Sequence, residues 1–377
     1  MRKLFICAFA LCVMCASDAL ACTTAAVTSG ASRYGRPMLW KQRDTSDPYN
    51  RLVHVSGGTY AYTSIFSCKD TLCAEAYAGI NEVGFAIINN MSYNIRPDSL
   101  GFDDTQEGQF MAEALACCRT VDDFERLVRE RPQPRILSTN IGVMDAGGAV
   151  AYFEVSDYDY TRFDVEPGGY LFRTNYSLTG EEGRGRGFAR YETMASLMAA
   201  RKTFDPEFFF RVGRSYLNGG DDALNGVYRG WLNEHDFIPR STTTACVVIE
   251  APGAGDAPDS GLMWCAPGYT PCCYAIPVWV AAGENIPRCL TGTAEANRLA
   301  AALYLSIHSD KDEIKKVDIA SLRRVLRSVR RAEGREFRKG RRLDRRMRRS
   351  GYDGPAVERF NRRSDNRFKH YKHRFAL

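Results

Sequence analysis

Residues 22–28 read Cys-Thr-Thr-Ala-Ala-Val-Thr, and residues 38–44 read Met-Leu-Trp-Lys-Gln-Arg-Asp. The small and β-branched side chains of the first stretch predict a buried strand. Glycine and proline between residues 29 and 37 predict a turn, after which the second stretch returns as a partner strand. We therefore expect residues 23–42 to form a hairpin directly after Cys22.

The rest of the chain alternates between strand-like and helical patterns. Strand patterns recur as far as residue 281, and helical patterns lie at residues 107–131, 187–200 and 206–217. From residue 294 the pattern is helical nearly to the end. Strand blocks flanked by helical blocks predict a layered α+β domain with a helical C-terminal extension. The 377 residues, 45% of them hydrophobic, exclude wholesale disorder, a collagen-like chain and a polytopic membrane protein.

The charge is divided unevenly along the chain. Residues 311–377 carry 24 Lys and Arg against 9 Asp and Glu, whereas the remainder carries 27 against 36. An acidic body therefore precedes a basic tail. Apolar residues at near-helical spacing predict that the tail begins with a helix packed on the body, its basic face in solvent. These residues are Ile314, Val317, Leu322, Val325, Leu326 and Val329.

The tail also raises the question of a partner. Arginine pairs between Arg341 and Arg349 lie beyond the apolar stripe, and we expect partial disorder there. The alternative to a solvated face is contact with an anionic membrane. Nucleic acid is not favoured as a partner, because no nucleic-acid-binding motif accompanies the basic residues. The oligomeric state is left open by the sequence.

Residues 1–21 have the pattern of a signal peptide. Arg2 and Lys3 precede an apolar stretch, and Ala19-Leu20-Ala21 forms a cleavage site. Cleavage predicts an exported chain, periplasmic or extracellular, that begins with Cys22. The alternative is a lipoprotein in which Cys22 carries a lipid anchor. Such a signal usually has an aliphatic residue, commonly Leu, three positions before the cysteine, where this sequence has Ala19.

Nine further cysteines follow Cys22. Export permits disulfides, and Cys68 and Cys73, which flank a short polar loop, are the expected pair. Cys117 and Cys118 end an apolar helical stretch and are expected in the core. No C-x-x-C pair is accompanied by a second pair or by a histidine cluster, so we expect neither a metal nor another cofactor.

A cysteine at a mature N-terminus combines a nucleophile and a base in one residue. The free α-amine has a pKa of about 7.7–8.0, so part of it is neutral at neutral pH. It can take the thiol proton directly or through one water, and no catalytic histidine is then needed. Such a site also requires polar groups around the amine and donors for a tetrahedral oxyanion.

Five stretches in order resemble the N-terminal nucleophile hydrolases. The nearest group is the acyl-coenzyme A:6-aminopenicillanic acid acyltransferase-like family, related to choloylglycine hydrolases and penicillin V acylases. The resemblance covers about residues 22–290 and implies a four-layer αββα fold that cleaves or transfers linear amide bonds. Its stretches are Cys22-Thr23-Thr24, Gly35 to Asp44, Asn81 to Asn90, Tyr170 to Tyr176 and Ala275 to Trp279.

The resemblance also implies roles for individual residues. Cys22 matches the nucleophile, and Asp44 matches the acid that binds its amine. Asn175 matches an oxyanion donor, and either Asn89 or Asn90 is the second. Lys41 stands where bile-salt hydrolases have Arg, and Gln42 stands where the family usually has Asn. The remaining expected site residues are Arg240 in the active site and, with Lys41, Arg43 for substrate binding.

The sequence thus predicts an exported N-terminal-cysteine amidohydrolase that acts on a small-molecule amide. The alternatives are acyl transfer, a secreted dipeptidase that also begins Cys-Thr-Thr, and the lipoprotein with a binding or structural role. The expected organisation is a signal peptide at residues 1–21, an N-terminal nucleophile hydrolase domain at residues 22–293 and the basic helical extension at residues 294–377.

Overall fold

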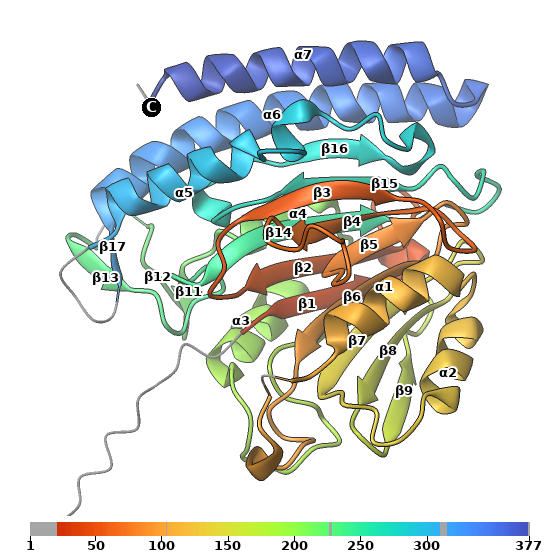
Figure 1. Cartoon of the computed structure of the whole chain (residues 1–377). Helices are drawn as coiled ribbons and strands as arrows, with labels where there is room; N and C mark the ends of the chain where they lie inside the picture. Colours follow the sequence, from red (N-terminus) through yellow and green to blue (C-terminus); the bar gives the residue numbers. More distant parts are fainter. Residues whose placement is uncertain (1–20, 103, 226–227, 310–314, 376–377) are drawn as a thin grey trace, which may run out of the picture.

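The computed structural model describes residues 21–102, 104–225, 228–309 and 315–375. The expected signal peptide, apart from Ala21, lies outside the described residues, as does Ile314 of the expected apolar stripe. Figure 1 shows two stacked β-sheets with helices on their outer sides. No helix in the described part of the chain is long and apolar enough to cross a membrane.

The first sheet contains the expected hairpin near its centre. Its strands β1 and β2 are antiparallel, with Thr23 opposite Gln42 and Val27 opposite Met38. The small side chains of β1 and all residues of β2 are buried. The six strands follow the order β10 (Tyr170–Arg173), β1 (Thr23–Val27), β2 (Met38–Asp44), β14 (Thr243–Glu250), β15 (Leu262–Ala266) and β16 (Ile276–Trp279).

The second sheet is an antiparallel meander in chain order. It packs face to face on the first sheet, with β6 and β7 lying over β1 and β2. Its strands are β3 (Asn50–Val55), β4 (Tyr62–Ser67), β5 (Ala78–Asn81), β6 (Ala86–Met91), β7 (Thr139–Met144), β8 (Val150–Val155) and β9 (Tyr160–Asp164). Two small pairs complete the strands: β11 (Leu217–Asn218) with β12 (Asp221–Asp222), and β13 (Trp231–Asn233) with β17 (Lys316–Asp318).

Helices cover the outer faces, so the layers are helix, sheet, sheet, helix. α1 and α2 cover the seven-stranded sheet, and α3, α4 and α6 contact the six-stranded one. Successive residues of a strand point to opposite faces, and in β6 Ile88 joins the core between the sheets while Ile87 joins the core under α1 and α2. This confirms the four-layer αββα prediction. The helices are α1 (Glu107–Cys117), α2 (Val121–Glu130), α3 (Phe188–Ala199), α4 (Pro206–Val212), α5 (Glu295–Ile307), α6 (Ile319–Ser350) and α7 (Gly354–His373).

The helical section expected at residues 107–131 consists of two helices, because Thr120 caps α2 by accepting from the backbone N–H of Asp123 and receiving the Asp123 side chain in return. Two predictions about cysteines need correction. Cys117, expected in the core with Cys118, is exposed. The disulfide expected between Cys68 and Cys73 is absent, since both are free thiols in the structure.

The C-terminal extension is helical as predicted, but the expected disorder near Arg341 is wrong. α6 continues unbroken to Ser350, and Phe337, Leu343 and Met347 extend its buried stripe well past Val329. Gly340 lets the helix approach the sheet closely, because a Cβ there would lie 2.9 Å from the ring of Trp264. The extension is therefore a packed layer of the fold.

Candidate active site

Cys22 lies directly before β1, where the hairpin places it beside the end of β2. Its side chain is 8% exposed and lines a cavity of about 900 Å³. The Cys22 thiol contacts the backbone oxygen of Asp44 at 3.9 Å. A cysteine at the wall of a cavity of this size can reach a bound small molecule, since ligand pockets typically measure about 300–1,000 Å³.

Asp44 ends β2 and is almost completely buried. Its Oδ1 accepts a hydrogen bond of 2.6 Å from the Thr243 hydroxyl, which enters from β14. Its Oδ2 is buried and has no hydrogen-bond partner among the described residues. Burial raises the pKa of Asp44 to about 6, although the nearby guanidinium groups of Arg240 and Arg190 oppose the rise. Asp44 lines the same cavity as Cys22, and its Oδ2 can accept a further donor.

Lys41 also lines the cavity and lies three residues before the end of β2. Its Nζ donates to Asn89 Oδ1 at 2.6 Å and to the backbone oxygen of Tyr77 at 2.9 Å. Burial lowers the pKa of Lys41 to about 8. Asn89, on β6, keeps its amide nitrogen nearly free, because the donor distance to Thr139 Oγ1 is 3.4 Å. The structure thus brings Lys41 and Asn89 together beside Cys22.

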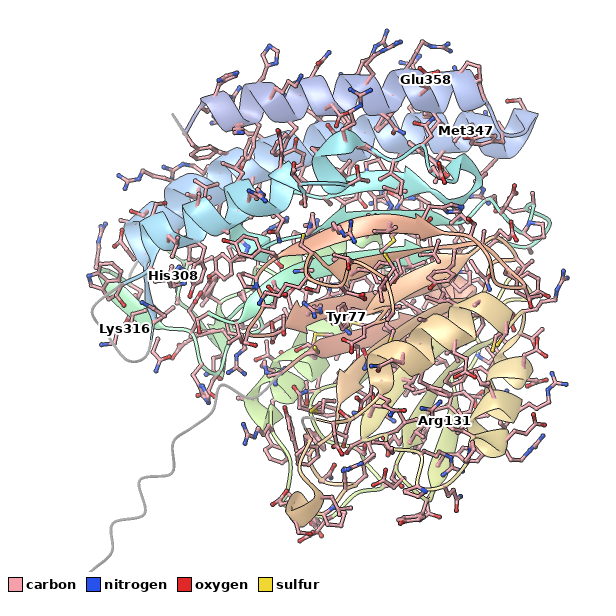
Figure 2. The ribbon with its side chains drawn as sticks, viewed as in Figure 1. Tyr77, Arg131, His308, Lys316, Met347 and Glu358 are labelled. Atoms are coloured by element: carbon pink, nitrogen blue, oxygen red, sulfur yellow. The ribbon has the colours of Figure 1, made fainter. Side chains whose placement is uncertain are left out.

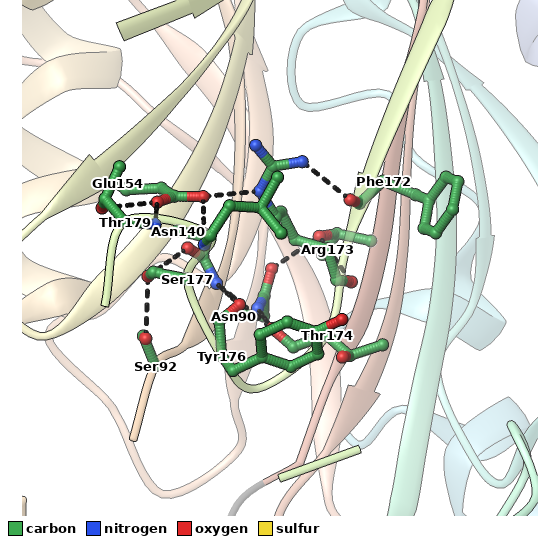
Figure 3. A network of polar contacts seen from close by, with 12 residues as sticks. Asn90, Ser92, Asn140, Glu154, Phe172, Arg173, Thr174, Tyr176, Ser177 and Thr179 are labelled. Carbon is green, nitrogen blue, oxygen red and sulfur yellow. Dashed lines mark hydrogen bonds and ion pairs between the residues drawn. The ribbon is translucent and has the colours of Figure 1, made fainter. Parts of the chain in front are cut away.

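Asn90 lines the same cavity but differs from Asn89 in its hydrogen bonds. Its Oδ1 accepts from Thr24 Oγ1 at 2.6 Å, and its amide nitrogen donates to the backbone oxygen of Thr174. Figure 3 shows Asn90 inside a polar network that joins the two sheets and includes Asn140 and Ser177. Both ends of the Asn90 amide are therefore used in holding the sheets together, whereas the Asn89 nitrogen is not.

Asn175 is fully buried and is not among the residues that line the cavity. Its amide nitrogen donates to the backbone oxygen of Met91 at 2.9 Å, and its Oδ1 accepts from Arg190 at 2.8 Å. Arg190, on α3, also donates to the Cys22 carbonyl and to Thr23 Oγ1, both at 2.8 Å. Asn175 therefore reaches Cys22 through Arg190. Nothing in the sequence singled out Arg190, because its three partners come together only in the tertiary fold.

Two expected arginines lie around the same centre. Arg43 lines the cavity, donates to Asn50 Oδ1 at 2.8 Å and lies over the Tyr77 ring at 3.7 Å. Arg240 is 7% exposed and influences the charge of Asp44, but it is not part of the cavity wall. Arg43 can face a substrate, whereas Arg240 balances the buried carboxylate.

The rest of the cavity wall was not anticipated. Tyr77, labelled in Figure 2, and Tyr93 provide aromatic surface, while Glu75 and Glu107 provide carboxylates. These residues follow turns or open α1, so their periodicity gave no sign of a shared cavity. Within the described residues, no group of three His, Cys, Asp or Glu is placed to hold a metal ion.

No protein-family model and no curated protein matches the sequence. Among solved structures, the chain is similar to the Caenorhabditis elegans ortholog of N-acylethanolamine-hydrolyzing acid amidase, with 12% identity, 63% of this chain and 92% of that chain covered, and a TM-score of 0.41. It is similar to a variant of conjugated bile acid hydrolase from Clostridium perfringens (11% identity, 69% and 92% covered, TM-score 0.40). It is also similar to penicillin V acylase from Agrobacterium tumefaciens, with 16% identity, 67% of this chain and 85% of that chain covered, and a TM-score of 0.41.

Proposed function

We propose that the chain is an N-terminal-cysteine amidohydrolase that cleaves linear amide bonds, once the residues before Cys22 are removed. The observation that carries the proposal concerns Asp44, which contacts the cavity-lining Cys22 thiol through its backbone oxygen and whose buried Oδ2 has no hydrogen-bond partner among the described residues. A free α-amine on Cys22 is a donor that fits this acceptor. Ala21, which is 1% exposed, would leave room for the amine when it is cleaved away.

The proposed reaction passes through an acyl-enzyme. The α-amine of Cys22 takes the proton from Sγ, and the sulfur attacks the amide carbon to form a tetrahedral oxyanion. The amide nitrogen of Asn89 donates to that oxyanion, with the Lys41 ammonium beside it. The C–N bond breaks as the protonated α-amine returns its proton to the leaving nitrogen. Water, deprotonated by the same amine, then cleaves the thioester and restores the thiol.

The burial of Cys22 supports an enzyme over a lipoprotein. A diacylglyceryl group on Sγ would have to occupy the cavity that the thiol lines. We propose export from the signal-like pattern of residues 1–21. Outside the cytoplasm water is the abundant acyl acceptor, so hydrolysis is proposed rather than acyl transfer. The acyl-amide class is proposed over dipeptides on the resemblance of residues 81–90 and 170–176.

The test uses the protein expressed from the full-length sequence and purified after any processing by the cell. The mass of its N-terminal peptide identifies a free Cys22 or a lipid adduct, and release of amine from a panel of acyl amides and dipeptides measures activity. We expect a free cysteine, activity on acyl amides, and loss of activity in Cys22→Ala with the fold retained. Cys117→Ala is the matched control, since Cys117 is exposed and lies outside the cavity. Full activity of processed Cys22→Ala would refute the mechanism.

A further inference from the structure

The two C-terminal helices separate their charges between two faces. The acidic residues of α6 are buried and paired: Glu333 binds Arg214 at 2.7 Å, Glu336 binds Arg367, and Asp344 binds Arg36 at 3.4 Å. The basic residues of α6 are mostly exposed. The negative charges of α6 are thus neutralised by ion pairs inside the fold. The outer face of the helix carries almost only positive charge.

The exposed charge of this layer is nearly all of one sign. Between Ile319 and Phe375, 17 Lys and Arg are exposed, against one exposed acid, Glu358, which is labelled in Figure 2. On α6 an exposed stripe repeats at a spacing of three or four residues, which keeps it on one side of the helix. The stripe contains Arg324, Arg327, Arg331, Arg335, Arg338, Arg342, Arg345 and Arg349. At about 1.5 Å per residue it is about 37 Å long.

Most of these exposed Lys and Arg side chains have no hydrogen bond or ion pair with the part of the chain that the structure describes. Arg338, Arg342, Arg345 and Arg349 make no side-chain hydrogen bond or ion pair to any described residue. Arg342, Arg345 and Arg349 frame a shallow hollow together with Arg346. Cations crowded in this way repel one another, and a polyanionic surface would remove the repulsion. Such a surface is the partner to which the charge is complementary.

We propose that the α6–α7 face docks on the anionic surface of a lipid bilayer. Figure 1 shows α6 and α7 side by side as the outermost layer, with α7 furthest from the sheets. A broad layer of two helices suits a plane, whereas the DNA major groove, about 12 Å wide, admits a single helix. Among the described residues of these helices and their loop, Tyr352 is the exposed large hydrophobic side chain. Single-stranded nucleic acids need more aromatic surface on which to stack.

The binding is electrostatic and does not require insertion. The apolar residues of α6 are already buried against the six-stranded sheet, as the contacts of Phe337 with Trp264 and Phe210 show. The face therefore lacks the apolar half of an inserting amphipathic helix. Attraction of this kind is screened over about 8 Å at physiological ionic strength, so salt should release the protein. No residue assigned to the active site belongs to this face.

The test uses co-sedimentation of the full-length protein with vesicles. One set contains phosphatidylcholine alone, and the other contains phosphatidylcholine mixed with phosphatidylglycerol. The variant replaces four unpaired arginines of α6 with Gln: Arg338→Gln, Arg342→Gln, Arg345→Gln and Arg349→Gln. A matched control removes four exposed positive charges from the body: Arg119→Gln, Arg129→Gln, Arg201→Gln and Lys202→Gln. Thermal unfolding verifies that both variants fold.

We expect salt-sensitive binding to the phosphatidylglycerol vesicles alone. The α6 variant should bind roughly 100-fold more weakly or worse, because each basic residue near an anionic surface contributes about a fivefold factor. The control should bind like the parent. Equal binding to both vesicle types, equal losses in the two variants, or tight binding to duplex DNA without vesicle binding would each overturn the proposal. Activity on a soluble amide is expected to be unchanged in the α6 variant.

Discussion

The Nζ atom of Lys41 lies 2.6 Å from Oδ1 of Asn89, so a cation on β2 fixes the amide of a residue on β6. The contact crosses from one sheet to the other beside Cys22. Because the ammonium holds the amide oxygen, the amide nitrogen faces away from Lys41, and its one hydrogen bond to a described residue is the 3.4 Å contact with Thr139 Oγ1. This geometry distinguishes Asn89 from Asn90, which the sequence left as equal alternatives.

Asn89→Ala should lower kcat by roughly 10²–10³, the usual loss when one oxyanion donor is removed. KM should change less, because the ground-state amide gains less from this donor. Asn90→Ala should instead lower the unfolding temperature, since both of its amide contacts join the sheets. Steady-state kinetics and calorimetry on the two variants test the distinction. A kcat loss confined to Asn90→Ala would reverse the assignment.

Asp44→Asn should alter how stability depends on pH. The pKa of Asp44 is about 6 in the folded chain, above its ordinary 3.8. Between these pH values the folded state holds a proton that the unfolded state has lost, so the parent loses stability as pH rises from 4 to 6. Relative to Asp44→Asn, the loss should approach about 3 kcal/mol.

Urea denaturation of the unprocessed chain at pH 4 and pH 7 measures this effect for both proteins. The unprocessed form is required, because a free α-ammonium beside Asp44 would lower its pKa. The processed Asp44→Asn enzyme should in addition lose most of its activity. A stability gap between the two proteins that does not vary with pH would show that Asp44 is ionised normally.

Lys41→Gln should produce the opposite trend in alkaline solution. The pKa of Lys41 is about 8 in the folded chain, below its ordinary 10.5. Between these values the unfolded state binds the extra proton, so the parent gains stability relative to Lys41→Gln as pH rises. The gain should be about 3 kcal/mol between pH 8 and pH 10.5. Denaturation midpoints of the parent and of Lys41→Gln at pH 7.5 and pH 10 show whether the stability difference between them changes in the expected direction.

Arg190→Met should destabilise the chain by about 3 kcal/mol or more, because it leaves buried acceptors and the Asp44 charge without compensation. The acceptors are the Cys22 carbonyl, Thr23 Oγ1 and Asn175 Oδ1. Asn175→Ala should lose less stability and should still lower activity, since it acts on Cys22 through Arg190. Chemical denaturation and kinetics on both variants test this order. Equal stability losses in the two variants would contradict the inference that Asn175 acts on Cys22 through Arg190.

Truncation after Gly334 should prevent stable folding. The cut removes Arg341 and Asp344, the buried partners of Glu250 and Arg36. Breaking one buried ion pair costs about 3–5 kcal/mol, a large part of the stability of a typical domain. Soluble yield and circular dichroism of the truncated chain test the prediction. A folded, active product would show that residues 335–377 are not needed for folding or for activity.

The hairpin could be predicted from its turn residues and strand patterns, whereas the association of Asp44 with Cys22 was expected only from the family resemblance. Arg190 could not be predicted, since its helix approaches Cys22 from a distant part of the chain. The extension of the apolar stripe was missed because the arginines of α6 outnumber its apolar residues. Phe337, Gly340, Leu343 and Met347 nevertheless recur at helical spacing, and this was the available signal.

The contact between Arg36 and Asp344 also has a consequence for how the protein is made. Arg36 lies in the turn of the hairpin that follows Cys22, and its fully buried side chain pairs with a residue 308 positions later. During synthesis, Arg36 can therefore meet this carboxylate only after the next 308 residues, ending with Asp344, have been added. The six-stranded sheet that begins directly after Cys22 can bury this arginine fully only once α6 has been made.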